Sequence, residues 1–363
     1  MIKLELKCPG CGAVIQSDDP SKSGYINKNV LEKRKDDFLC ERCFKLKHYN
    51  QVKIVETKNI DFDSVFSKIS TEKSLIVNII DSFDLLGSVI TNINELFPNS
   101  LVLIIANKFD LFLRSNRPTK LRTYLKAYLK EKNIEFCDVL VTSSLDSASA
   151  KPIYETIKKY SRNRNVYFVG MANVGKSTLL NTISKEYGDK IDLTTSIQVG
   201  TTLDISKFKI GDLVFGDTPG YYNPKQATYY LEKKSLNLTI PKKYIKPRIY
   251  QLYPNDTIFI NGFGYVTLKS EEKTAICFYV ANTLMLYRTK NNPDEYYNKH
   301  LTDLLTVPNK NEINKLGGMK KTNLEIDCEL AISGIGFLTF SKKCSIELSL
   351  FENIAIEKRK KLI

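Results

Sequence analysis

The sequence has few features that would place the protein in or across a membrane. Its longest apolar runs, such as Leu101–Ala106, are far shorter than a membrane-spanning helix requires. The first residues, Met1–Lys7, contain no apolar segment typical of a secretory signal peptide. We therefore expect a cytoplasmic protein that makes no membrane contact, with eight cysteines that serve as thiols or metal ligands and form no disulfide.

Acidic residues are scarce relative to basic ones. The 363 residues include 54 Lys and Arg against 40 Asp and Glu, a formal net charge of +14. Residues 1–54 carry a net +4 and residues 231–363 a net +7, whereas residues 55–230 carry only +3. This distribution favours a polyanionic partner that is contacted by both flanks. The alternative is that the lysines only keep the surface solvated.

Three nucleotide-binding motifs are present, in an unusual order. Asn107-Lys108-Phe109-Asp110 matches the guanine-recognition motif NKxD, and it precedes both other motifs. A phosphate-binding loop of form GxxxxGKS follows at residues 170–177, and a DxxG motif at residues 217–220. An ordinary GTPase has the order GxxxxGKS, DxxG, NKxD. The sequence therefore predicts a circularly permuted GTPase domain.

Alternating apolar runs and helix-like stretches predict a doubly wound α/β sheet in this middle region. Ligands of such folds bind at the carboxyl ends of the strands, where all three motifs begin. One helix-like stretch between residues 144 and 166 is enough for the parallel crossover that the permutation requires. The expected strands are Leu75–Ile80, Leu101–Ala106, Asp138–Val141, Val166–Val169 and Leu213–Asp217, with helices over Lys120–Lys132 and Ile153–Tyr160.

The GxxxxGKS loop lies between an expected strand and an expected helix, which is the context that a phosphate loop needs. Glycines 170 and 175 allow the backbone to approach the phosphates, and backbone N–H groups at the start of the helix bind the β-phosphate. We expect Lys176 to neutralise the β- and γ-phosphates and the Ser177 hydroxyl to bind Mg²⁺. The predicted nucleotide contacts in this loop are Asn173, Val174, Gly175, Lys176, Ser177 and Thr178.

The NKxD motif predicts selection of guanine. Asp110 would accept hydrogen bonds from guanine N1–H and the 2-amino group, a donor pair that adenine lacks. Asn107 would brace the base and the phosphate loop, and the stem of Lys108 would stack on the ring. Ser143 and Ser144 occupy the place of the short second guanine loop, which usually reads SA.

The DxxG motif predicts the third part of the site. Asp217 would hold Mg²⁺, directly or through water, and the Gly220 N–H would contact the γ-phosphate. Residues 199–203 lie where switch I belongs, and we expect Thr202 to reach Mg²⁺; the alternative is that its threonines are ordinary loop residues. The residue after DxxG is Tyr221, where Ras-like enzymes have the glutamine that orients water, so slow intrinsic hydrolysis is expected.

Two CxxC pairs lie near the amino terminus. Cys8 and Cys11 form the first pair, and Cys40 and Cys43 the second. Two such turns supply the four thiolates of a closed tetrahedral Zn²⁺ site, which stabilises a segment too small to fold around its own core. A redox CxxC is the alternative, although the segment lacks a thioredoxin-like βαβ pattern.

The region after residue 230 is predicted to be a β-rich domain. Residues 249–288 and 324–350 contain β-type runs separated by glycines, and residues 293–305 have a helical pattern. Basic residues interleaved with aromatics around Tyr244 and the basic run Lys358–Lys361 suit contact with RNA. A solvated linker and tail is the alternative.

The combination of cysteine pairs, permuted motifs and a carboxy-terminal domain resembles the YqeH family of circularly permuted GTPases. The segment Asp81–Asp84 with Gly87 and Ser88 also resembles that family's sequence ahead of NKxD. The resemblance implies a zinc-finger domain over 1–54, a permuted GTPase domain over 55–230 and an RNA-binding domain over 231–363. It also implies GTP and GDP as ligands, a K⁺ ion bound with help from Asn173, and the small ribosomal subunit or its rRNA as partner.

Two other functions remain open at this point. One is an RNA-binding scaffold in which the nucleotide is structural and turnover negligible, a reading that Tyr221 leaves possible. The other is a metabolic phosphotransferase, which the joint presence of NKxD and DxxG disfavours. Because switch II runs almost directly into the carboxy-terminal domain, we expect loss of the γ-phosphate to move that domain.

Overall fold

The computed structural model describes residues 8, 14–20, 24–28, 40–41, 62–112, 116–187, 205–301 and 303–362. Its helices are α3 Phe62–Ser70, α4 Leu85–Ser88, α5 Ile93–Leu96, α6 Pro118–Glu131, α7 Ala150–Ser161, α8 Lys176–Glu186, α9 Lys233–Thr239, α10 Pro293–His300 and α11 Lys310–Leu316, with 3₁₀ turns η2 Phe109–Leu111, η3 Ser147–Ser149, η4 Ala227–Tyr230 and η5 Asn261–Phe263. Its strands are β1 Ser74–Asp81, β2 Leu101–Asn107, β3 Asp138–Val141, β4 Asn165–Val169, β5 Ser206–Ile210, β6 Leu213–Asp217, β7 Arg248–Leu252, β8 Thr257–Ile260, β9 Gly264–Leu268, β10 Thr274–Val280, β11 Leu286–Thr289, β12 Met319–Ile326, β13 Glu329–Ile332, β14 Gly336–Phe340, β15 Cys344–Phe351 and β16 Ile356–Arg359.

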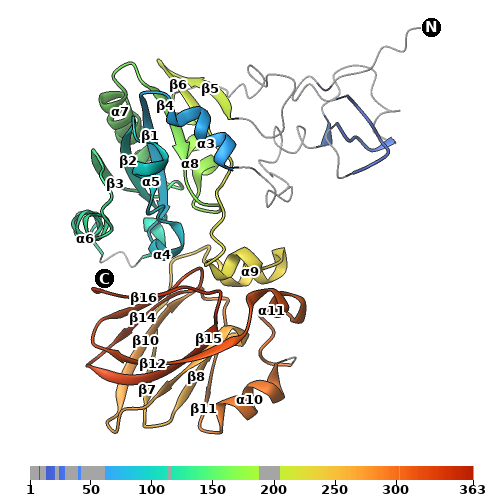
Figure 1. Ribbon diagram of the computed structural model, residues 1–363, viewed down its shortest axis with the longest axis vertical. Helices are drawn as coiled ribbons and strands as arrows, with labels where there is room; N and C mark the ends of the chain where they lie inside the picture. Colours follow the sequence, from blue (N-terminus) through green and yellow to red (C-terminus); the bar gives the residue numbers. More distant parts are fainter. Residues whose placement is uncertain are drawn as a thin grey trace.

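The first of two layered bodies is a six-stranded sheet in the order β3-β2-β1-β4-β6-β5 (Figure 1). All neighbouring pairs are parallel except β5 with β6. Strand β1 lies between β2, the next strand in the chain, and β4, which follows only after β2 and β3. The motif-bearing strands β2, β4 and β6 therefore end at one edge, as the permuted P-loop fold requires.

Helices cover both faces of this sheet. Ile76 and Val77 point to opposite faces of β1, and both are fully buried. Leu125 of α6, Ile157 of α7 and Leu179 of α8 belong to the same core. The predicted strands and the two predicted helices are present, with ends shifted by at most a few residues. Among the described residues, no helix has the length and apolar content to cross a bilayer.

The second body, at the bottom of Figure 1, consists of two antiparallel five-stranded sheets. Their orders are β16-β13-β14-β10-β7 and β11-β8-β9-β15-β12. Alternate side chains of both sheets, such as Phe278 from the first and Val266 from the second, form one buried core. The predicted β-rich character is confirmed, and the helical pattern near 293–305 is helix α10, which ends at His300.

The two bodies pack directly against each other. Phe337 and Ala331 of the carboxy-terminal body belong to the apolar core of the nucleotide-fold body. Tyr128 of α6 donates a hydrogen bond of 2.8 Å to the carboxylate of Glu357 on β16, and the Ile245 N–H donates to the Leu111 carbonyl at 2.9 Å. The carboxy-terminal body therefore rests on the side of the sheet that carries NKxD, next to α6 and η2.

Candidate nucleotide site

The loop between β4 and α8 has a backbone path that excludes side chains at two points. Gly175 has φ +94°, and a Cβ there would lie 2.3 Å from the Asn107 amide nitrogen. A Cβ on Gly170 would lie 2.4 Å from the Ile79 carbonyl oxygen on the neighbouring strand. The loop therefore packs closely on β1 and β2 only because both positions are glycine. Its first helical residue is Lys176, so the N–H groups of the first turn of α8 face the loop.

Two opposite charges lie beneath this loop, a buried lysine and a partly buried aspartate. Lys176 is 8% exposed, and its Nζ donates to the Gly170 carbonyl at 3.2 Å. Burial lowers the pKa of Lys176, with Asp217 opposing the shift. Burial also raises the pKa of Asp217 to about 6, with Lys176 opposing it. The buried Asp217 Oδ1 has no hydrogen-bond partner among the described residues. An unpartnered carboxylate oxygen beside a buried ammonium fits a site that holds phosphate oxygens and a divalent cation.

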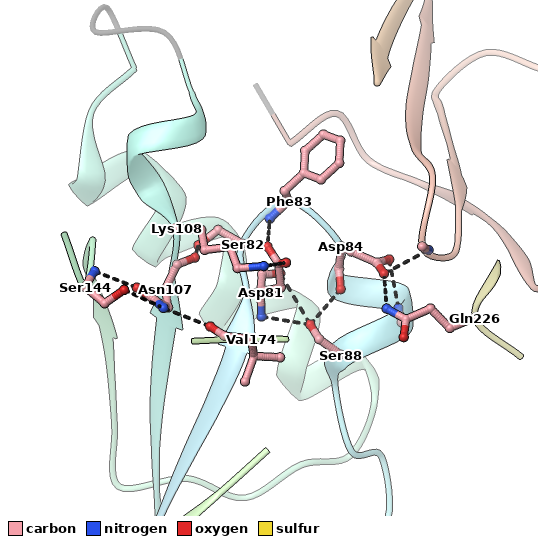
Figure 2. Close-up of polar contacts among 12 residues, drawn as sticks. Asp81, Ser82, Phe83, Asp84, Ser88, Asn107, Lys108, Ser144, Val174 and Gln226 are labelled. Carbon is pink, nitrogen blue, oxygen red and sulfur yellow. Dashed lines mark hydrogen bonds and ion pairs between the residues drawn. The ribbon is translucent and has the colours of Figure 1, made fainter. Parts of the chain in front are cut away.

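Asn107, at the end of β2, ties the base-recognition loop to the phosphate loop (Figure 2). Its side chain is fully buried and donates to the Val174 carbonyl at 2.8 Å and to the Ser144 hydroxyl at 3.3 Å. Its amide oxygen accepts from the Ser144 N–H at 2.8 Å. One side chain therefore links three loops that are far apart in the sequence.

The other NKxD side chains are also held in place. Ser143 donates its hydroxyl to Asp110 Oδ1 at 2.6 Å, so the second guanine loop positions the carboxylate. Lys108 has a left-handed backbone, φ 66°, and its Nζ lies 2.6 Å from Asp81 Oδ2 (Figure 2). Both partners of that ion pair are largely covered, with exposed side-chain fractions of 18% and 14%.

The DxxG segment is paired with the phosphate loop. The Tyr221 N–H donates to the Gly170 carbonyl at 3.1 Å, and the Ala172 N–H donates to the Tyr221 carbonyl at 2.7 Å. A Cβ on Gly220 would lie 3.0 Å from the Ala172 Cα, so the two backbones are in close contact. Thr218 is anchored on β4 through a 2.8 Å bond to the Phe168 carbonyl.

The structure thus brings the predicted residues of NKxD, the second guanine loop, the phosphate loop and DxxG to one end of the sheet. Asn173, Ser177 and Thr178 are exposed at the loop. Asn173 has φ 65°, a conformation that Asn adopts more readily than most residues. The predicted Mg²⁺ ligand Thr202 lies outside the described residues.

Half of the predicted zinc site lies within the described residues. Cys8 and Cys40 are both buried, and the Cys40 N–H donates to the Cys8 sulfur at 3.2 Å. Cys11 and Cys43 lie outside the described residues. Within the described ranges, no group of three or more His, Cys, Asp or Glu side chains is placed to hold a metal ion.

Sequence reasoning assigned no role to Asp81 or Asp84. Asp84 is 8% exposed and accepts hydrogen bonds from the Gly87 N–H, the Gln226 amide and the Gly334 N–H (Figure 2). In the sequence, only the resemblance of residues 81–88 to the family's segment ahead of NKxD pointed to these two aspartates, and it gave them no function.

Two family models match the chain. Residues 165–246 match the model described as 50S ribosome-binding GTPase, and residues 273–362 match the model described as YqeH-like, C-terminal. The first match spans the phosphate loop and DxxG, and the second covers most of the second β body.

Curated relatives match along nearly the whole chain. The uncharacterized protein YqeH of Bacillus subtilis (strain 168) is 34% identical over 92% of this chain and 92% of its own length. The NO-associated protein 1, chloroplastic/mitochondrial, of Arabidopsis thaliana is 24% identical over 92% of this chain and 69% of its own. A solved structure of GNP-bound YlqF from T. maritima is 19% identical, covering 48% of this chain and 64% of that one, with a TM-score of 0.31.

Proposed function

Because the chain belongs to the YqeH family and is a circularly permuted GTPase, we propose that it is a cytoplasmic assembly factor for the small ribosomal subunit. It binds rRNA or the subunit in a manner set by GTP or GDP. The proposal of nucleotide binding rests on the Asn107 side chain, which joins the NKxD loop to the Val174 carbonyl of the phosphate loop. That link makes the base subsite and the phosphate subsite one rigid unit.

Each residue of the site has a role that its surroundings suit. Asp110, held by Ser143, accepts the two guanine donors, and Lys176 neutralises the β- and γ-phosphates. Asp217 with Ser177 supplies oxygen ligands for Mg²⁺, and Thr202 completes that set. The metal contributes charge neutralisation at the phosphates.

Hydrolysis must proceed without a glutamine after DxxG. Tyr221 stands at that position, and its backbone is already engaged with Gly170 and Ala172. The chain therefore has a low intrinsic rate that rises when a partner orders the site. We propose that the exposed Asn173 helps to hold a K⁺ ion, whose charge takes the place of an arginine finger.

The amino-terminal segment is proposed to hold structural zinc. The four thiolates of Cys8, Cys11, Cys40 and Cys43 form the donor set, and the Cys40 N–H on the Cys8 sulfur is the kind of contact that stabilises a thiolate ligand. A closed four-sulfur site has no open position for catalysis.

The proposed RNA contact lies on the carboxy-terminal body. Tyr244 is 43% exposed and lies among Lys242, Lys243 and Lys246, which are also surface residues. This combination offers phosphate contacts beside a ring on which a base can stack. The description of the family model that matches residues 165–246 names the 50S ribosome, so both ribosomal subunits must be tested.

Co-sedimentation with purified small and large subunits tests the proposal, with a non-hydrolysable GTP analogue, GDP or no nucleotide. We expect at least about tenfold tighter binding to the small subunit with the analogue than with GDP. The Asp110→Asn variant, which replaces one of the two acceptor oxygens for guanine by an NH₂ donor, should bind no better with the analogue than without it. Large-subunit binding alone would overturn the choice of partner.

A rate measurement separates the enzyme from a scaffold with a structural nucleotide. GTP turnover with and without the bound subunit should rise by about tenfold or more if the subunit completes the site. Binding that ignores the nucleotide, with no stimulation, would favour the scaffold. Tighter binding of ATP than of GTP would favour a phosphotransferase.

A further inference from the structure

The segment that follows β1, residues 81–88, lies between the base-recognition loop and the carboxy-terminal body. The site chemistry described above uses none of its side chains except Asp81, through Lys108. The segment is folded on itself, because the Ser88 hydroxyl donates to the Asp84 carbonyl at 2.6 Å and accepts from the Asp81 N–H at 2.9 Å (Figure 2). Ser82 donates to the Asn107 carbonyl at 2.6 Å. One end of the segment is therefore fixed to the NKxD loop.

The other end of the segment holds a carboxylate that connects three separate parts of the chain. Asp84 Oδ1 accepts from the Gly87 N–H at 3.0 Å. Its Oδ2 accepts from the Gln226 amide at 2.6 Å and from the Gly334 N–H at 2.8 Å. Gln226 lies six residues after Gly220 of DxxG, and Gly334 lies between β13 and β14 of the carboxy-terminal body.

The hydrogen bonds at this position favour an ionised carboxylate, although burial opposes ionisation. All three neighbours are N–H donors, and a carboxylate is the side chain that accepts at both oxygens and donates at neither. The site also has no spare room, since a Cβ on Gly87 would lie 2.2 Å from Asp84 Oδ2. An asparagine of the same shape would place its NH₂ group, itself a donor, against at least one of these N–H donors.

The surrounding contacts make this connection part of a larger interface. Phe83, next to Asp84, packs on Phe337 with ring centroids 5.8 Å apart. Downstream of DxxG, the Ala227 N–H donates to the Ser333 carbonyl at 3.0 Å, and the Lys225 carbonyl accepts from the Ala355 N–H at 2.9 Å. Residues 225–227 are therefore bonded to the carboxy-terminal body, and Asp84 bonds to both partners.

The burial and hydrogen bonding of the Asp84 carboxylate suit a contact that can open. Burial raises the pKa of Asp84 to about 6, although its three donors oppose the shift. The nearby Asp81 carboxylate also raises the pKa of Asp84. The carboxylate is thus only partly compensated for its lost hydration, so moving one donor away favours opening of the whole contact.

We propose that residues 81–88 form a coupling joint in which Asp84 is the positioning residue that transmits movement of the DxxG segment to the carboxy-terminal body. A γ-phosphate at Gly220 displaces Tyr221 and the residues after it, and Gln226 then leaves Asp84 and frees Gly334. This inference rests on the proposed nucleotide-gated function and identifies the contact through which the gate acts.

Hydrogen exchange of the full-length chain tests the joint. We expect exchange in residues 331–337 to differ by about tenfold between GDP and a non-hydrolysable GTP analogue in the unmodified protein. Asp84→Asn should reduce this difference to less than about twofold, while GDP affinity stays within about threefold of the unmodified value. Gln226→Met, which keeps the chain length and removes the donor, should do the same and provides a second variant if Asp84→Asn folds poorly.

A matched control is Asp212→Asn, at an exposed carboxylate in the turn between β5 and β6. It should keep the full nucleotide-dependent difference. The proposal is overturned if Gln226→Met retains that difference, or if the unmodified chain shows none. The proposed assembly function fails separately if hydrogen exchange of the chain responds to nucleotide but the chain binds neither ribosomal subunit.

Discussion

The buried Asp84 carboxylate predicts an unusual dependence of stability on pH. Its pKa is raised from the ordinary value of 3.8 to about 6 in the folded protein, chiefly by burial. The folded state therefore binds a proton more tightly than the unfolded state does. Stability contributed at this group is present below about pH 4 and is lost as the pH rises through about 6. Most structural carboxylates, which have lowered pKa values, behave in the opposite way.

The size of the effect follows from the shift. A difference of about two pH units corresponds to about 3 kcal/mol of unfolding free energy. Asp84 is buried, so solvent screening does not reduce this figure much. We expect the difference in unfolding free energy between the unmodified protein and Asp84→Asn to change by about 2–3 kcal/mol between about pH 4 and about pH 7.

Urea unfolding followed by circular dichroism measures this difference. Asp212→Asn is the control, and its unfolding free energy should change with pH as that of the unmodified chain does. Burial also raises the pKa of Asp217, but that group is present in both proteins and its contribution cancels in the comparison. Parallel stability curves for the unmodified protein and Asp84→Asn would refute the reasoning, because they would mean that Asp84 is hydrated in the folded state.

Three further predictions concern other contacts. Asn107→Ala leaves a buried carbonyl and a buried N–H unpaired, so we expect a loss of about 2–4 kcal/mol in urea unfolding and at least about tenfold weaker GDP binding by fluorescence titration. Glu329→Gln breaks a buried ion pair with Arg359 at 2.6 Å, and should lower the unfolding free energy by about 3 kcal/mol while GDP affinity is retained. Asp81→Asn removes the charged partner of Lys108 and should weaken GDP binding by about threefold to tenfold in the same titration; unchanged affinity would show that the ion pair plays no part in holding the base loop.

The sequence predicted the parts of the fold that depend on local pattern. The buried strands and the three motifs at their ends could be predicted because apolar runs and fixed spacings carry that information. Asn107 was expected to brace the phosphate loop, and its side-chain amide donates a hydrogen bond to the Val174 carbonyl. The order of the motifs implied the crossover through α7, which the structure contains.

The contacts of Asp81 and Asp84 could not be predicted in this way. Asp84 bonds to Gln226 and Gly334, which lie 142 and 250 residues further along the chain. No spacing rule connects such positions, and a single aspartate after a strand has many possible partners. The pairing of the carboxy-terminal strands into two sheets was equally inaccessible, because short β runs separated by glycines do not specify their neighbours.

The permuted strand order also fixes the sequence of events while the chain is being made. Within the six-stranded sheet, residues 74–141 leave the ribosome first and carry β1, β2 and β3 with the base-recognition loop. Until β4 emerges, one side of β1 has no partner strand and presents open hydrogen-bonding groups. The phosphate subsite is complete only when Asp217 has been added. A nascent chain of this protein therefore contains its NKxD motif before its phosphate loop, the reverse of the order in an ordinary GTPase.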